Sequence, residues 1–344
     1  MGGSKNVFAA VKSYSKRGKL LKNADFQTLA ESRDLDELMT RIKNTSYGES
    51  ISEVEKPYTS QSIENALRGH LADIHYSIAK TAGESKVLDA YFSKFLISNL
   101  KQILKGKVLG KSQEEIEIHI NFRAEELTKQ RDVVVKALVA GDLEEAVASL
   151  NQAEFGEEIS KAAALYEDKK NIQIFDTYFD KILFTRLVKA LKSGGIDAGK
   201  IIGMDIDFYN ILSVIRGKFW GLDDAQIQDL IIVQCPVAKD LLTRMMSAGT
   251  IKDAFNELSN TKYKNLIPSV ENELDAISEF ERAFELAIYQ ASLNSFTKMF
   301  SFATTIGITK LTAFEVRNLA AIAYAVEQKI PTETTMSKLI LMTE

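Results

Sequence analysis

One stretch of the chain occurs twice and decides the fold. Residues 99–110 read NLKQILKGKVLG, and residues 210–221, which lie 111 positions later, read NILSVIRGKFWG. Both begin with Asn, carry a basic–Gly–Lys triplet and end with Gly. A weaker third copy begins at Asn318 and has Tyr-Ala-Val at 324–326 in place of the triplet. Such recurrence indicates an internally repeated architecture.

A second, unrelated stretch recurs with nearly the same period. Residues 34–47 (DLDELMTRIKNTSY) return as residues 250–263 (TIKDAFNELSNTKY), with a fainter version at 142–150 (DLEEAVASL). Two independent patterns that share one period favour three copies of a single unit. We therefore predict three similar units, which are residues 1–130, 131–240 and 241–344.

The spacing of apolar residues within a unit is helical. Apolar residues recur every three or four positions, as in Ile63, Leu67, Leu71, Ile74 and Ile78. Only 4 prolines and 18 glycines interrupt the 344 residues, and no alternating apolar stretch is bounded by hairpin turns. The sequence predicts an all-α fold.

Composition narrows the classes of function. The formal net charge of −4 argues against a general nucleic-acid binder. Cys235 is the single cysteine, which rules out an intrachain disulfide and fits a reducing interior. The densest apolar stretches, 230–238 and 319–326, are too short to span a bilayer. If the protein works at a membrane, we expect it to dock onto a component that is already there.

Motifs for catalysis or metal binding are incomplete. Residues 106–112 (GKVLGKS) have three residues between their glycines instead of the four of a phosphate-binding loop, and residues 194–201 end in Ile instead of Ser or Thr. The three histidines are His70, His75 and His119; His70 and His75 are five residues apart, a poor spacing for one metal on a helix, and at most form a weak cluster with Asp73. We predict no catalytic residue, no cofactor and no metal site.

The repeated asparagines are the first candidate positions. Asn99, Asn210 and Asn318 stand on otherwise apolar helix faces. A buried amide is stable only when it is hydrogen-bonded, so these side chains are expected to form a polar network in each unit. We favour that structural role over ligand binding.

The repeated basic residues are the second set of candidate positions. Lys105, Lys107, Arg216 and Lys218 lie in the last turns of their helices, where cations interact favourably with the helix dipole. Two basic groups at one helix end exceed what the dipole requires. We therefore keep a contact with a partner protein as a second interpretation.

The triplicated pattern resembles a known family. Asp207, Asn210 and the 216–218 triplet, followed by Gly-Leu at 221–222 and a capped helix, are similar to the C subunit of archaeal A-type ATP synthases, the homologue of the d subunit of eukaryotic V-ATPases. Further matches lie at 14–21, 67–73 and 315–319, so the resemblance spans the chain. One departure is Leu96, where the family usually has Asp.

The resemblance implies a fold and a role. The family has three helical domains arranged as a funnel with pseudo-threefold symmetry. It is a non-catalytic part that joins the central-stalk subunits of D and F type to the membrane proteolipid ring. It thereby couples ATP synthesis or hydrolysis to proton or sodium transport at the cytoplasmic face of the membrane. The alternative is a generic helical scaffold, whose units would stack linearly as a solenoid.

Overall fold

Every regular element in the described parts of the chain is a helix, as the sequence predicts. The structure, a computed structural model, describes residues 2–151, 155–192, 199–232 and 239–341. The N-terminal half contains α1 (Gly2–Arg17), α2 (Asn23–Ala30), α3 (Leu35–Lys43), α4 (Ser60–Ala82), α5 (Lys86–Phe92), α6 (Lys94–Val108), α7 (Gln113–Glu117), α8 (Phe122–Thr128), α9 (Arg131–Val139), α10 (Leu143–Leu150) and α11 (Gly156–Lys169). The C-terminal half contains α12 (Gln173–Lys192), α13 (Gly199–Phe219), α14 (Asp224–Leu230), α15 (Lys239–Ser247), α16 (Ile251–Asn256), the 3-10 helices η2 (Glu257–Asn260) and η3 (Lys264–Leu266), α17 (Glu273–Asn294), η4 (Ser295–Thr297), α18 (Ala303–Glu327) and α19 (Thr332–Lys338).

The second repeated stretch marks the start of a short helix at each occurrence. Asp34, Asp142 and Thr250 are the N-caps of α3, α10 and α16. Each side chain accepts a hydrogen bond from the backbone N–H three residues later, at 2.9, 2.9 and 3.0 Å. This bond satisfies a backbone donor that the helix itself leaves without a partner. The recurring Asp or Thr therefore has a local reason.

The long helices α6, α13 and α18 end in the same way. Gly110 and Gly221 have φ of +66° and +68°, and Lys329 takes the corresponding place with φ of 55°. In each case the next residue donates its N–H to the carbonyl five residues before it, at 3.0, 2.9 and 2.8 Å. This geometry is the Schellman motif, in which a left-handed residue terminates a helix. It turns the chain back toward the following short helix.

A buried asparagine then fixes that short helix against the long one. The carboxamides of Asn99, Asn210 and Asn318 donate to the carbonyls of Asn121, Ile232 and Ile340, the residues 22 positions later, at 3.2, 3.1 and 2.7 Å. The N–H groups of these three residues donate back to the same side chains at 2.9, 2.8 and 3.0 Å. All three asparagines are at most 3% exposed. We call each arrangement a joint.

Close packing accompanies each joint. A Cβ added to Gly106 or Gly217 would lie 2.5 or 2.7 Å from Cγ1 of the isoleucine ten residues later, on α7 or α14. Glycine is therefore required for this close helix contact. The third joint has Ala325 and Thr335 at the two corresponding positions. A larger residue on the long helix is matched there by a smaller one on the short helix.

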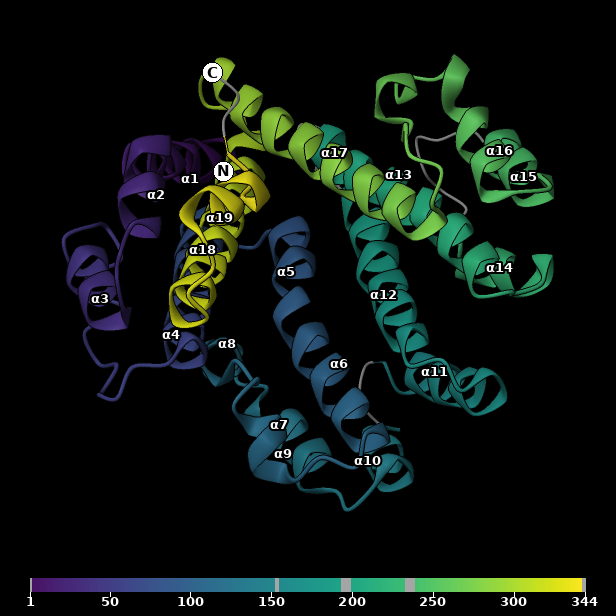
Figure 1. Cartoon of the computed structure of the whole chain (residues 1–344), viewed down its shortest axis with the longest axis horizontal. Coiled ribbons are helices and arrows are strands. Elements are labelled where there is room, and N and C mark those ends of the chain that lie inside the picture. The colour runs from purple at the N-terminus through teal and green to yellow at the C-terminus, as the bar shows by residue number, and fades with distance from the viewer. Residues whose placement is uncertain (1, 152–154, 193–198, 233–238, 342–344) are drawn as a thin grey trace.

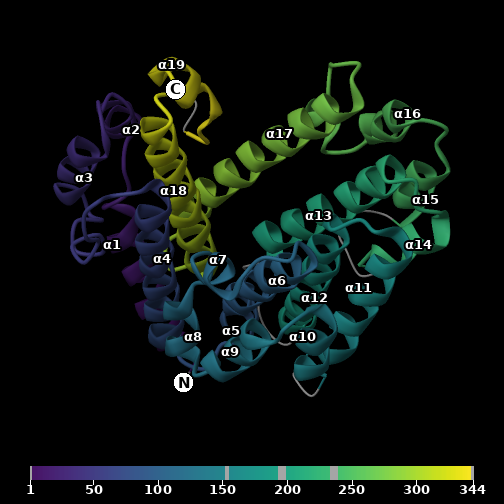
Figure 2. The ribbon, with the colours of Figure 1, turned by 60° about the horizontal axis from the view of Figure 1, so that its bottom comes forward.

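The beginning and the end of the chain pack together. Helix α6 packs against α9 and α10, and α13 packs against α15 and α16; α18 packs in the same manner against α2 and α3 at the opposite end of the sequence. Figures 1 and 2 both show the N-terminal helices (purple) beside α18 and α19 (yellow). The two ends of the chain therefore meet, and we call this contact the closure of the chain.

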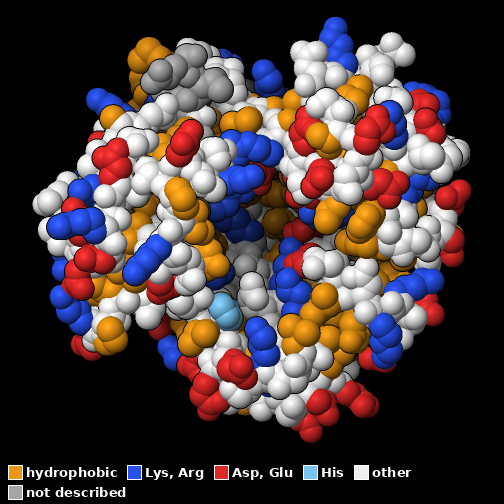
Figure 3. Space-filling view, viewed as in Figure 1, with side chains coloured by type: hydrophobic (Ala, Val, Ile, Leu, Met, Phe, Trp, Pro, Cys, Tyr) orange, Lys and Arg blue, Asp and Glu red, His pale blue; other side chains and the backbone are white. Residues whose placement is uncertain are grey.

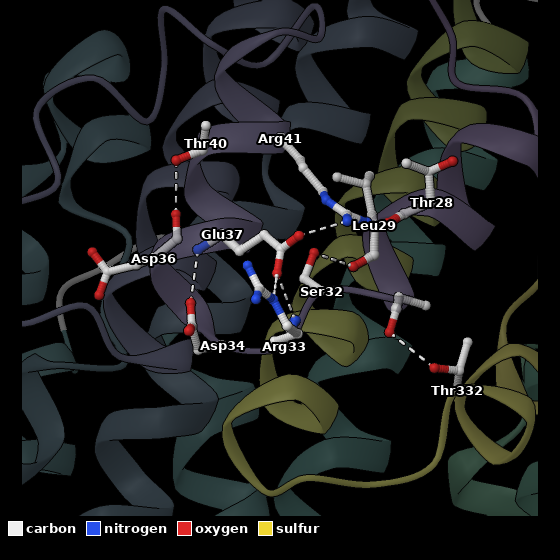
Figure 4. A network of polar contacts seen from close by, with 11 residues as sticks. Thr28, Leu29, Ser32, Arg33, Asp34, Asp36, Glu37, Thr40, Arg41 and Thr332 are labelled. Atoms are coloured by element: carbon white, nitrogen blue, oxygen red, sulfur yellow. Dashed lines mark hydrogen bonds and ion pairs between the residues drawn. The ribbon is translucent and has the colours of Figure 1, made fainter.

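Polar contacts reinforce this closure. The carboxylate of Glu315 on α18 accepts hydrogen bonds from the hydroxyl of Tyr47, at 2.7 Å, and from the backbone N–H of Leu21. The hydroxyl of Thr332, at the start of α19, donates to the carbonyl of Ala30 at the end of α2, at 3.2 Å (Figure 4). These contacts join residues about 270 to 300 positions apart in the sequence.

The tyrosine–carboxylate pair has a counterpart at the second joint and an apolar replacement at the first. Tyr263 donates to Asp207, which lies three residues before Asn210, as Glu315 does before Asn318. At the first joint the corresponding residues are Leu96 and Phe155, and both belong to one buried apolar cluster. The departure at Leu96 is therefore matched by Phe155, which stands where the other two joints have the tyrosine that binds the carboxylate.

The joints generate a prediction about stability. Asn210→Leu should lower the free energy of unfolding by about 1–3 kcal/mol, because the buried N–H and C=O of Ile232 would lose their partner. Urea unfolding of the variant measures the loss, and Asn260→Leu, at an exposed position, is the control. Asn99→Leu and Asn318→Leu should cost similar amounts. An unchanged midpoint in the Asn210 variant would contradict the assigned role.

The closure generates a second prediction. Burial raises the pKa of Glu315 to about 7 from 4.5, although the hydrogen bonds from Tyr47 and Leu21 oppose the shift. The folded chain then binds this proton more tightly than the unfolded chain does. The contribution to stability is therefore fully present below about pH 4.5 and is lost as the pH rises through about 7, by up to about 3 kcal/mol.

The measurement is urea unfolding over this pH range. Glu315→Gln, which is neutral throughout, should unfold with a flatter pH dependence than the unchanged chain. Glu333→Gln, on the exposed side of α19, should retain the original slope. An identical slope in the Glu315 variant would show that Glu315 does not carry the effect.

Candidate functional site

A cavity of about 470 Å³ lies at the centre of the helices. Its walls come from α5, α6, α12, α13, α17 and α18, which include the three long helices that carry the joints. The space-filling view shows this face hollowed at its middle, with Lys and Arg side chains gathered along the wall of the hollow (Figure 3). The cavity is the candidate site.

The three long helices contribute side chains to the cavity at matching positions. Lys94, Asp205 and Ala313 each lie five residues before the asparagine of their joint, and all three line the cavity. The repeat thus places one charge of each sign and one small apolar residue around the same space. Because the joints fix how the long helices are held, they also fix where these side chains point.

An ion pair crosses the cavity wall between α18 and α13. The ammonium of Lys310 lies 2.7 and 2.8 Å from the two carboxylate oxygens of Asp205, which is 4% exposed. Burial opposes the charge of Lys310, but the pairing with Asp205 outweighs it and raises the pKa of the ammonium. A buried pair of this kind depends on both partners, because removal of one leaves the other charge uncompensated.

The other carboxylates that line the cavity are paired as well. Arg216 binds Glu281 at 2.6 Å, which joins α13 to α17, and the second guanidinium nitrogen of Arg317 binds Glu285 at 2.9 Å, which joins α18 to α17. Asp180 on α12 accepts from Lys101 on α6 at 2.6 Å. These pairs join the helices that form the walls of the cavity. They supply polar surface but no arrangement of acid, base and nucleophile for catalysis.

Two of the predicted contact residues bind helix ends inside the chain. The ammonium of Lys107 donates to the carbonyls of Leu138, at 2.8 Å, and Ala140, at the end of α9. Lys218 donates in the same way to the carbonyls of Met246 and Ala248 at the end of α15, at 2.8 and 2.6 Å. Each lysine therefore caps a neighbouring helix, where the carbonyls carry partial negative charge.

The other two predicted contact residues form ion pairs between helices. Lys105 lies 3.0 Å from Asp176 on α12, and Arg216 pairs with Glu281 as described above. Their side chains remain 23% and 35% exposed, so part of each charged group faces the solvent. Arg216 also lines the central cavity, whereas Lys105 does not.

The remaining sequence candidates do not assemble a site. Ser112, from the phosphate-loop-like stretch, is the N-cap of α7. His75 is buried against the carbonyl of Thr309, at 3.0 Å, and His70 bonds with Ser50. Within the described ranges no three His, Cys, Asp or Glu side chains form a group that could hold a metal. Cys235 and residues 194–198 lie outside these ranges.

Sequence reasoning missed the charged residues of the cavity. Lys94, Asp205 and Lys310 lie on apolar helices and belong to no motif. An alignment of the repeats could have revealed them, because Lys94 and Asp205 share the position five residues before the asparagine of each joint. A charge at a position that the repeat places inside the molecule indicates a cavity or a buried ion pair.

None of the helices in the described segments is both long enough and apolar enough to cross a bilayer.

Comparison with known proteins gives the family. Residues 9–338 match the family described as ATP synthase (C/AC39) subunit. Among curated relatives, the C subunit of the A-type ATP synthase of Methanocaldococcus jannaschii is 27% identical, over 95% of this chain and 84% of the relative. The proteins of the same name from Pyrococcus horikoshii and Thermococcus onnurineus are 23% and 27% identical, each over 92% of this chain and over 85% and 84% of the relative. The chain therefore belongs to the ATP synthase (C/AC39) subunit family and is a non-catalytic subunit of a rotary A/V-type ATP synthase.

Proposed function

We propose that this protein connects the rotating central stalk to the proteolipid ring in the membrane. The foot of the stalk, formed by subunits of D and F type, enters the central cavity, and the ring lies against another face of the molecule at the cytoplasmic side of the membrane. The protein thereby couples ATP synthesis or hydrolysis to the transport of protons or sodium ions.

The observation that carries the proposal is the cavity itself. It opens at the middle of one face, and helices from distant parts of the sequence wall it. Ion pairs join these helices to one another around the opening. A part that transmits torque needs such a rigid socket, since walls that yield would lose the rotation of the shaft. Polar surfaces also suit an interface that must separate again.

We further propose that the chain is built from three units, residues 1–130, 131–240 and 241–344, related by pseudo-threefold rotations. The support is the recurrence of the joint, with its 22-residue interval, in each unit. Three similar long helices around one cavity would form a funnel.

A linear scaffold is the alternative function. Its repeats would stack in one direction and leave the first and last units apart. Here α2 and α3 pack against α18, so the two ends of the chain share one apolar core. The closure favours a socket over a solenoid.

The coupling role predicts a clear result in reconstituted vesicles. ATPase complexes assembled without this protein should hydrolyse ATP in the soluble head yet accumulate no ions in the vesicle lumen, because rotation would not reach the ring. Addition of the purified protein should restore ion accumulation. Undiminished ATP-driven ion accumulation in its absence would refute the proposal. The measurement is ion uptake and phosphate release in the same samples.

Contact of Arg216 with the stalk can be separated from its internal ion pair. Arg216→Met and Glu281→Gln break the same pair, so each should cost a similar amount of stability, about 1 kcal/mol. Only the arginine variant should also weaken binding of the purified stalk complex, measured by titration calorimetry at low salt. Equal binding by the two variants would limit Arg216 to its internal role. The same comparison applies to Lys105→Met and Asp176→Asn.

A further inference from the structure

One basic group in the central cavity lacks a carboxylate partner. Of the basic side chains that line the cavity, Lys310, Arg216 and Arg317 each form an ion pair. Within the part of the chain that the structure describes, Lys94 is the lining cation with no carboxylate within ion-pair distance. The carboxylates of the cavity are already bound to other cations.

The ammonium of Lys94 lies over aromatic rings and not beside a carboxylate. It is 4.4 Å from the centre of the Tyr91 ring and 5.3 Å from that of Phe95, and the ring faces attract a cation without neutralising its charge. Burial, and then the nearby charge of Lys310, lower the pKa of Lys94 well below its usual value, while Asp205 opposes the shift. Asp180, Glu281 and Glu285, on α12 and α17, also face the cavity, each bound to its own cation.

The charge of this lysine is not balanced by a carboxylate of the chain. Aromatic rings only partly offset the desolvation of a half-buried ammonium, and an apolar side chain of similar length would pack on the same rings without that cost. The group does not hold the helices together, since the neighbouring pairs do so. Its position at the wall of an open cavity is therefore explained by something that arrives from outside.

We propose that Lys94 receives a carboxylate side chain from the segment of the central stalk that enters the cavity. The inference rests on the proposed function and names the chemistry of the contact. The incoming Asp or Glu completes the charge balance of the cavity, and the Tyr91 and Phe95 rings exclude water around the new pair. A charge pair formed in such a place favours the correct partner, because a neutral or basic segment would leave the ammonium uncompensated.

The test is titration calorimetry of the full chain with the purified complex of D- and F-type stalk subunits. Lys94→Met should weaken binding roughly 10- to 100-fold. Thermal unfolding of the same variant, without the stalk, should occur at an equal or higher temperature. Lys111→Met, at an exposed lysine outside the cavity, should change neither quantity. A purely structural lysine would instead lower the unfolding temperature and leave the affinity of the folded protein unchanged.

Proton uptake gives a second readout. A bound carboxylate raises the pKa of Lys94, so complex formation at a pH where the free chain has partly lost this proton should take up protons, detected as a dependence of the binding heat on the ionisation enthalpy of the buffer. The Lys94→Met variant should lose this dependence. Equal affinities and equal proton uptake for the variant and the unchanged chain would overturn the inference and leave the proposed function intact. Failure of the unchanged chain to bind the stalk complex would overturn the proposed function itself.

Discussion

The exchange of two hydrogen bonds between a buried asparagine and the backbone 22 residues later is the interaction on which the rest of the structure depends. It fixes an irregular segment, which has no helical partner for its N–H and C=O groups, against a long helix. The close glycine contact and the left-handed helix end beside it are required by the same tight return of the chain. Because the joint occurs on α6, α13 and α18, it also orients the three helices that carry charge to the cavity.

Much of the fold was predictable, because local signals repeat. The Asn, Gly and N-cap residues each have a backbone reason to be where they are, and the period revealed them without any knowledge of tertiary structure. The contact of α2 and α3 with α18 was not predictable, since it joins residues that share no local pattern. The cavity was missed for a similar reason: Lys94 and Asp205 are single charges on apolar helices, and only their shared place before each joint connects them.

Variation among the three joints shows which parts can be exchanged. The first joint replaces a tyrosine–carboxylate pair with Phe155 and Leu96, so both partners become apolar and no polar group is stranded. The third joint has Val326 in place of the capping lysine, and the hydroxyl of Thr332 there bonds to the carbonyl of Ala30 on α2. The asparagine and the left-handed helix end persist in all three. What persists is what the backbone requires, and what varies is how side chains fill the space around it.

The closure of the chain has a consequence for its synthesis on the ribosome. Helices α2 and α3 are made early, yet their apolar residues Phe26, Leu29 and Leu38 share a core with α18, which is made near the end of synthesis. At translation rates of about 5–20 residues per second, these side chains wait roughly 15 to 60 s for their partner. Until then the apolar surface that these helices bury against α18 lacks that partner. The chain can therefore complete its first and second joints before α18 is available to cover α2 and α3.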